Sequence, residues 1–248
     1  MLDIVMVFIV SFVATALSSM SGGGASVITI PALLLMGVSF PLATAAQKVS
    51  STFWVLPAAY NYLKDRKVDW RFIFLFSGIG LLGVYAGVSL VVLANPRVMQ
   101  IIIGILILVL VTYTFFKKDI GITDGKIFSK LRQRFSYVFA LILGFYEGIF
   151  GAGNGIMFAI VTLKTKGFDF IDALGYYFAV AFSWVFFAAV ILISKGYFSW
   201  SIMIPTVIGS VIGGYVGSRY AKYKGNKFIK IMFVVVGGIL GIKLLVGF

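Results

Sequence analysis

Ten apolar segments, separated by short polar joints, run through the sequence from one end to the other. A helix needs about 20 apolar residues to cross the hydrocarbon core of a bilayer, and most of the segments come close to that length. They lack the alternating ten-residue pattern of a transmembrane β-barrel. Hydrophobic residues make up 61% of the chain, well above the share in soluble domains. The sequence therefore predicts an all-α, polytopic membrane helical bundle, with helices near residues 2–20, 24–37, 40–63, 70–94, 97–116, 135–150, 155–163, 170–194, 200–220 and 228–247.

Two of these segments, 24–37 and 155–163, are too short to cross a bilayer, and each directly follows a glycine-rich break. The first break reads Ser21-Gly22-Gly23-Gly24 and the second reads Gly151-Ala152-Gly153-Asn154-Gly155. Glycine has no Cβ, so it ends helices and lets the backbone approach a ligand closely. Broken backbone at membrane depth is tolerated only in the protein interior or beside a wet cavity. Short, glycine-interrupted segments at matching places in two halves indicate a transporter's binding site. A tight helix hairpin without a ligand is the alternative.

The two halves of the chain match without gaps when the sequence is shifted by 130 residues. In this register residues 23–87 align with residues 153–217, and we call each aligned residue the counterpart of the other. Coincidences of uncommon residues in one register indicate an internal duplication. They include Trp54 with Trp184, Trp70 with Trp200, Gly83 with Gly213 and Gly87 with Gly217. We expect two transmembrane repeats, residues 1–116 and 135–248, joined by a basic linker at residues 117–134.

The positions of the basic residues predict how the repeats are oriented. The short segments are either broken spanning helices or limbs of re-entrant hairpins, and both readings place 17 of the 21 lysines and arginines on one side. By the positive-inside rule that side is cytoplasmic, and both termini lie outside. The repeats then have inverted topology, which supports alternating access. Topology and anionic lipids, rather than nucleic acid, explain the net charge of +13. We expect the protein in the cytoplasmic (inner) membrane of a prokaryote.

The chain contains no cysteine and no histidine. Thiolate chemistry and imidazole metal ligation or base catalysis are therefore excluded. We expect no cofactor, no metal and no enzymatic activity. Serine chemistry with Ser50 or Ser51 beside Lys48 is the enzymatic alternative that the sequence leaves open.

Two ionisable residues lie deep inside predicted spans, where charge is costly and usually functional. Lys48 lies about eight residues, or roughly 12 Å, into its span. Glu147 precedes Gly151 by four residues. Lys48 either binds an anionic substrate or pairs with Glu147 and releases it when substrate arrives, and Glu147 alternatively carries the proton of coupled transport. A structural ion pair is the non-functional alternative. Gln47 and Asn154 add hydrogen-bonding groups next to these positions.

Other conspicuous residues have structural interpretations. Glycines at a spacing of about four, in 80–87 and in 209–217, predict seams where helices pack closely. Trp54 and Trp184 are candidates to line the site, but a tryptophan in a span is more often a packing or interface residue, and the same holds for Tyr177. Asp169 lies near the end of its span and is expected to be wetted or to cap a helix.

These motifs resemble the sulfite exporter TauE/SafE family over essentially the whole chain. The resemblance is carried by Ser21-Gly22-Gly23-Gly24 and by Ala46-Gln47-Lys48-Val49-Ser50-Ser51. The run Gly144-Phe145-Tyr146-Glu147-Gly148-Ile149-Phe150-Gly151-Ala152-Gly153-Asn154-Gly155 is similar to the YfcA-like branch. The resemblance implies a duplicated bundle that moves small anions, namely sulfite, organosulfonates and related sulfur or carboxylate anions. It also places Lys48 and Glu147 at family motif positions.

One stretch departs from that pattern. The counterpart of the basic site around Lys48 reads Gly175-Tyr176-Tyr177-Phe178 and contains no lysine. If relatives carry a cation there, the substrate preference or the coupling of this protein differs.

We therefore expect a secondary transporter of a small anion that works by alternating access, with a passive anion channel as the alternative. The expected partners are the anion and the lipid bilayer, and a homodimer is left open. Glu147 is the expected coupling residue or ion-pair partner of Lys48. The expected substrate-binding residues are Ser21, Gly22, Gly23, Gly24, Gln47, Lys48, Gly151, Gly153, Asn154 and Gly155.

Overall fold

The computed structural model describes residues 4–22, 24–91, 96–116 and 129–246. Every regular element in these ranges is an α-helix, as the sequence predicts. In chain order the helices are α1 (Ile4–Ser21), α2 (Ala25–Leu35), α3 (Phe40–Leu63), α4 (Trp70–Val91), α5 (Pro96–Phe116), α6 (Lys130–Ile149), α7 (Asn154–Thr165), α8 (Phe170–Ser194), α9 (Trp200–Lys224) and α10 (Asn226–Val246).

The helix bounds follow the predicted segments closely, including the two short helices α2 and α7. The main difference is α6, which begins at Lys130 and so extends into the predicted linker. Residues 130–134 read Lys-Leu-Arg-Gln-Arg. All of these are good helix formers, and long basic side chains at a helix end reach back to water. Residues 117–128 of the linker lie outside the described residues.

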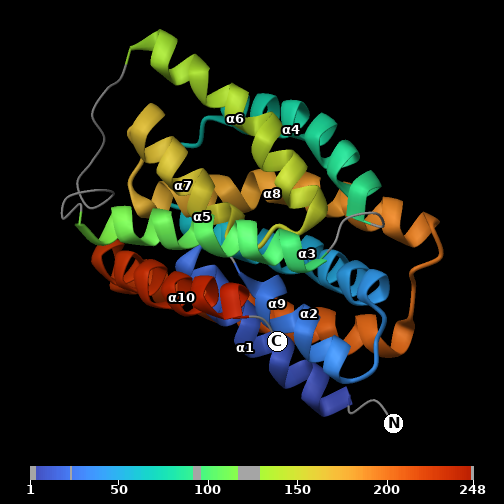
Figure 1. Ribbon diagram of the computed structural model, residues 1–248. Coiled ribbons are helices and arrows are strands. Elements are labelled where there is room, and N and C mark those ends of the chain that lie inside the picture. The colour runs from blue at the N-terminus through green and yellow to red at the C-terminus, as the bar shows by residue number, and fades with distance from the viewer. Residues whose placement is uncertain (1–3, 23, 92–95, 117–128, 247–248) are drawn as a thin grey trace.

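Helices of the first half pack mainly on helices of the second half. α1 lies against α9 and α6 lies against α4, while α3 packs on α8 and α5 packs on α10. In Figure 1 the α4–α6 pair is at the top of the view and the α1–α9 pair at the bottom, with α3 and α8 between them. Near the start of α8, Gly175 packs directly on Leu63 near the end of α3. The two central helices are therefore antiparallel.

Glycines let two of these helix pairs approach closely. On α4, a Cβ added at Gly83 or Gly87 would collide with backbone atoms of α6. On α9, a Cβ added at Gly213 or Gly217 would collide with backbone atoms of α1. Small residues at this spacing are what close helix contacts in membranes require. The predicted packing seams are confirmed.

Gly213→Ala should destabilise the protein by about 1–3 kcal/mol, the usual cost of overpacking. The reason is that its added methyl group would collide with the carbonyl oxygen of Phe12. A Cβ added at Gly78 on α4 would have no atom within 4 Å. Gly78→Ala should therefore be neutral or stabilise by up to about 1 kcal/mol through helix propensity. Thermal unfolding in detergent measures both variants, and equal unfolding temperatures would contradict the seam.

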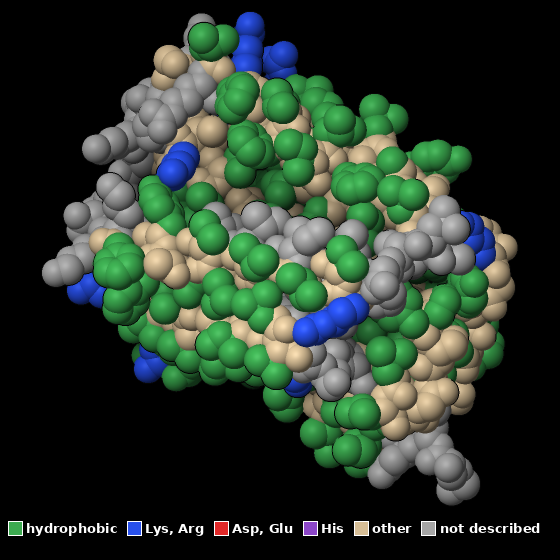
Figure 2. All heavy atoms as spheres, viewed as in Figure 1, with side chains coloured by type: hydrophobic (Ala, Val, Ile, Leu, Met, Phe, Trp, Pro, Cys, Tyr) green, Lys and Arg blue, Asp and Glu red, His purple; other side chains and the backbone are tan. Residues whose placement is uncertain are grey.

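Large apolar side chains cover much of the outer surface. Leu35 is 88% exposed, and Phe74 and Leu82 are each 70% exposed. Figure 2 shows one face that is mostly hydrophobic and carries few lysines and arginines. In the described part of the chain, four helices are long and apolar enough to cross a membrane: Ile4–Ser21, Trp70–Leu90, Phe170–Ser194 and Trp200–Lys224. The protein is an all-α membrane protein.

Candidate functional site

The two glycine-rich breaks lie against each other inside the protein. A Cβ added at Gly155 would collide with the carbonyl oxygen of Gly22. Gly22 and Gly24 have φ angles of 91° and 116°, and Gly151 and Gly153 have φ angles of 72° and 71°. These left-handed values are accessible to glycine at little cost. The backbone of both breaks therefore requires the glycines that mark them in the sequence.

Each break leads into the N-terminus of a short helix. Gly24 is the N-cap of α2 and Gly153 is the N-cap of α7, and neither N-cap makes a side-chain capping hydrogen bond. The first N–H groups of a helix carry partial positive charge. At α7, the N–H groups of Asn154 and Ile156 donate to the main-chain oxygens of Gly151 and Gly153. Because the breaks touch, the two positive helix ends begin close together. Such an arrangement favours an anion.

Lys48 on α3 and Glu147 on α6 form a buried ion pair. Their relative exposures are 1% and 4%, and Nζ of Lys48 lies 2.8 Å from Oε1 of Glu147. The ammonium group also donates a hydrogen bond to the main-chain oxygen of Glu147. Both side chains are buried away from water, so each charge is stabilised mainly by the opposite charge of its partner. In this structure, therefore, Lys48 is paired with Glu147.

The second carboxylate oxygen of Glu147 is bound from two further helices. Asn154 at the start of α7 donates to Oε2 from Nδ2 at 2.7 Å, and the hydroxyl of Tyr177 on α8 donates to it at 3.3 Å. Asn154 also donates to the main-chain oxygen of Leu143 at 3.1 Å. Gly151 packs on the carboxylate so closely that a Cβ there would collide with it. Glu147 thus joins α3, α6, α7 and α8 at one point.

A small cavity lies beside this carboxylate. Its volume is about 20 Å³, which is room for roughly one water molecule. Within the described residues, three buried polar atoms of its lining have no hydrogen-bond partner: Oγ of Ser18, Oε1 of Gln47 and Nε1 of Trp54. Buried polar groups without partners are rare in proteins and call for an explanation. The Ser18 hydroxyl and the Trp54 indole N–H are donors that an anion can use.

Most of the predicted site residues come together here. Gly24, Gln47, Gly151 and Glu147 line the cavity. Lys48 and Asn154 do not line the cavity, but both bind the carboxylate of Glu147, which does. Gly22 and Gly155 form the contact between the breaks.

Two predicted site residues, Ser21 and Gly153, do not line the cavity. Ser21 donates its hydroxyl to the main-chain oxygen of Leu17 on its own helix at 2.9 Å. Gly153 faces Ile107 of α5, whose side chain an added Cβ would meet at 2.8 Å. Gly23 lies outside the described residues. The two serines near Lys48 have other partners, because Ser50 donates to the main-chain oxygen of Gln47 and Ser51 accepts from the Gln47 amide.

Sequence reasoning missed Ser18, and it favoured packing over a place in the site for Trp54 and Tyr177. Both of the latter line the cavity, and Tyr177 binds Glu147. The sequence contains one indication that Tyr177 belongs to the site: it is the counterpart of Gln47, which was predicted to bind substrate. Trp184, the counterpart of Trp54, does pack as predicted: it lies on Gly80 and donates to the main-chain oxygen of Ser77 at 3.0 Å.

Ion pairs connect the segment between α3 and α4 with the segment between α7 and α8 and with the end of α9. Arg66, between α3 and α4, lies 2.9 Å from Asp169, between α7 and α8. Lys222 near the end of α9 lies 2.8 Å from Asp65, and this hydrogen bond lowers the pKa of the Asp65 carboxyl. Asp169 caps α8, as expected, but it is only 2% exposed and so is not wetted. These basic joints were predicted to share one side of the membrane, and they meet in the structure.

Comparisons with known proteins agree with these features. Residues 7–244 match the family described as sulfite exporter TauE/SafE. The chain is 28% identical over 242 residues to a "Probable membrane transporter protein" of Haemophilus influenzae, covering 96% of this chain and 92% of that protein. It is 29% identical over 243 residues to "Probable membrane transporter protein ORF9" of a Sinorhizobium species, covering 96% and 90%.

A third relative is "Probable membrane transporter protein YfcA" of Escherichia coli K12, which is 27% identical over 242 residues and covers 96% of this chain and 88% of that protein. No solved structure matches the chain. The family match extends across nearly the whole sequence, including both breaks and the Lys48–Glu147 pair. The chain belongs to the sulfite exporter TauE/SafE family, a family of membrane transporters.

Proposed function

We propose that the protein is a secondary transporter that moves a small anion across the cytoplasmic membrane by alternating access. The substrate class is sulfite, an organosulfonate or a related sulfur or carboxylate anion. The observation that carries the proposal is the buried Lys48–Glu147 pair beside two converging helix N-termini. Ionisable residues inside membrane proteins typically mark substrate and ion pathways. The anion would bind between the two breaks, held by helix N–H groups and by the charge of Lys48.

Glu147 couples anion binding to a proton in this proposal. The carboxylate of Glu147 binds the ammonium group of Lys48, so an anion can bind Lys48 only after this carboxylate is displaced or neutralised. Protonation neutralises the carboxylate and leaves the ammonium charge for the anion. The proton and the anion then bind together and cross together. Asn154 and Tyr177 keep the protonated side chain hydrogen-bonded, because both contact the same oxygen of Glu147.

The size of the central cavity supports a carrier rather than a passive channel. Room for about one water molecule is too little for a sulfite ion, so helices must move before an anion binds. We expect unlabelled sulfite on the far side of a proteoliposome membrane to accelerate the exchange of labelled sulfite, as a carrier does. Single-channel currents without accelerated exchange would support the channel instead.

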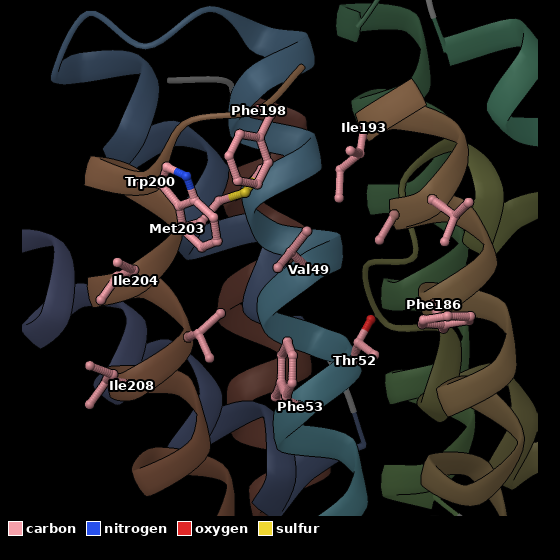
Figure 3. A pocket seen from close by; sticks show the side chains of 13 residues that line it. Val49, Thr52, Phe53, Phe186, Ile193, Phe198, Trp200, Met203, Ile204 and Ile208 are labelled. Carbon is pink, nitrogen blue, oxygen red and sulfur yellow. The ribbon is translucent and has the colours of Figure 1, made fainter. Parts of the chain in front are cut away.

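Two apolar crevices support an internal duplication. The first, about 490 Å³ in volume, lies between α3, α8 and α9. Figure 3 shows it with Val49, Thr52 and Phe53 from α3 and Trp200 and Met203 from α9. The second, about 660 Å³ in volume, lies between α3, α4 and α8. Of the 14 residues that line the second crevice, 12 are counterparts of residues that line the first, and this correspondence supports a duplication of structure as well as of sequence.

The directions of the helices support inverted topology. α3 and α8 are counterparts in sequence but run antiparallel. The second crevice lies at the α3–α4 joint and the first at the α8–α9 joint, which are at opposite ends of these central helices. The α3–α4 joint carries the basic residues, so we assign it to the cytoplasmic side and both termini to the outside. One repeat would then rock against the other about the site between them.

Glu147→Gln should remove the pH dependence of anion flux while anion binding remains. Glutamine resembles the protonated carboxyl group, so Lys48 stays available for the anion at every pH. Wild-type flux into proteoliposomes should rise as the pH on the uptake side falls, because the proton and the anion cross together and the inward proton gradient then drives uptake. Flux of labelled sulfite measured between about pH 5 and pH 8, the range around neutrality in which such sites work, checks this. A variant whose pH profile matches that of the wild type would exclude Glu147 as the proton carrier.

A further inference from the structure

The two crevices have similar walls but different rims. Lys64 and Arg66 line the rim of the crevice between α3, α4 and α8. Their counterparts Ser194 and Gly196 are uncharged and do not line the other crevice. The walls of the basic crevice are apolar, and Phe74 on its edge is 70% exposed. The crevice therefore opens on the lipid-facing surface. Because Arg66 pairs with Asp169 and Asp172, Lys64 supplies the positive charge at its one basic end.

A second, polar cavity adjoins this rim. It has a volume of about 280 Å³, lies between the ends of α3 and α9, and shares Lys64 with the apolar crevice. Lys64, Arg219 and Lys222 face it, against the single carboxylate of Asp65. Lys222 already pairs with Asp65 at 2.8 Å. In the described part of the chain no carboxylate forms an ion pair with Lys64 or Arg219, so this cavity holds excess positive charge.

We propose that the apolar crevice and the polar cavity together bind one anionic phospholipid. Its phosphate lies between Lys64 and Arg219, and one of its acyl chains fills the crevice between α3, α4 and α8. Trp70, which lines the crevice, is 61% exposed and is of the residue type that favours the headgroup level of a bilayer. A soluble anion would use the cations but not the apolar walls, whereas a phospholipid uses both. Basic pockets at the cytoplasmic ends of transmembrane helices suit such headgroups.

Native mass spectrometry of the purified protein tests this site. The probes are phosphatidylglycerol and phosphatidylcholine with the same acyl chains. We expect wild type to retain phosphatidylglycerol in preference to phosphatidylcholine. The Lys64→Gln/Arg219→Gln double variant should lower retention of phosphatidylglycerol about tenfold or more, since each basic residue near a membrane surface contributes about fivefold. Lys195→Gln is the matched control, because Lys195 is exposed at the equivalent joint at the other end of the bundle and lines neither crevice.

A second pair of variants tests the acyl-chain part of the site. Ala179 lines the basic crevice and its counterpart Val49 lines the other one. Ala179→Phe fills part of the basic crevice, so it should lower retention of both lipids, whereas Val49→Phe should leave phosphatidylglycerol retention unchanged. Equal retention of the two lipids by wild type would overturn the proposal, and so would equal losses in the Lys195 control and the double variant. A dimer that Ala179→Phe converts to monomer, with lipid retention unchanged, would assign the crevice to a second copy of the chain instead.

Discussion

Lys48→Ala should reduce anion flux about 100-fold or more. Truncating one partner of a buried, hydrogen-bonded charge pair in a binding site costs about 2–5 kcal/mol of binding free energy, and about 2.8 kcal/mol corresponds to a hundredfold weaker affinity. Leaving the other charge unpaired also lowers the stability of the fold by about 3–5 kcal/mol. Lys48 is 1% exposed, and the carboxylate that it contacts, 2.8 Å away, would remain without a counter-charge. The anion would also lose the positive charge that we assign to its site. Uptake of labelled sulfite by proteoliposomes measures the effect.

Loss of flux in Lys48→Ala alone does not separate a binding role from a structural one, because the variant also leaves Glu147 unpaired. The Lys48→Met/Glu147→Gln double variant removes both charges and keeps similar side-chain volumes. Replacing a whole buried ion pair with neutral groups is often neutral or even stabilising. We therefore expect the double variant to unfold near the wild-type temperature and still to lack anion flux. Wild-type flux in the double variant would show that the pair is purely structural.

Gly22→Ala should both destabilise the protein and abolish flux. Gly22 has a φ of 91°, and a Cβ there would lie 2.8 Å from the side chain of Leu174 and 3.3 Å from the carbonyl carbon of Gly155. The left-handed backbone costs about 1–2 kcal/mol for a residue with a side chain, and overpacking adds about 1–3 kcal/mol. The methyl group would also push the two breaks apart. Thermal unfolding and sulfite uptake are the measurements.

Gly196→Ala is the matched control for this substitution. Gly196 has nearly the same φ, 87°, but no atom lies within 4 Å of its added Cβ. Gly196→Ala should therefore lose only the stability that the left-handed backbone costs, and it should retain flux. We expect its unfolding temperature to lie several degrees above that of Gly22→Ala. If both variants lose stability and flux equally, the contact between the breaks has no special role.

The helices could be predicted from the sequence because lipid imposes a simple rule. Long apolar segments must be helical where water cannot satisfy the backbone, and glycine-rich breaks are visible as composition. The short helices α2 and α7 and the close glycine seams of α4 and α9 were predicted for these reasons. The start of α6 was predicted five residues too late, since basic residues were taken as linker although they also extend a helix.

The detailed lining of the site could not be predicted, because it depends on small differences between equivalent positions. Trp184 lies over Gly80, where no side chain blocks its ring. The counterpart of Gly80 is Ser210, which carries a side chain where Gly80 has none. Trp54 instead packs on Gly214 and lines the central cavity, where its indole N–H has no partner among the described residues. Two tryptophans in equivalent sequence positions thus have different roles.

The contact between Lys48 and Glu147 is of a different kind. The two residues are 99 positions apart, and the sequence predicts only that both are buried and opposite in charge. Burial without water makes an opposite charge the natural partner of each, so the pair could be named as an alternative. The alignment of Tyr177 with Gln47 was the only indication in the sequence that Tyr177 belongs to the site. Its hydrogen bond to Glu147 could not be predicted, because it depends on how α8 lies against α6.

Anion binding by purified protein tests the central role of Lys48 most directly. A ligand that binds the native state raises its apparent stability as the ligand concentration exceeds the dissociation constant. We expect sulfite, an organosulfonate or a carboxylate to raise the thermal unfolding temperature of wild type in a concentration-dependent way, and to leave that of the Lys48→Met/Glu147→Gln variant unchanged. An equal rise in both proteins would place the anion away from Lys48 and contradict the proposed site.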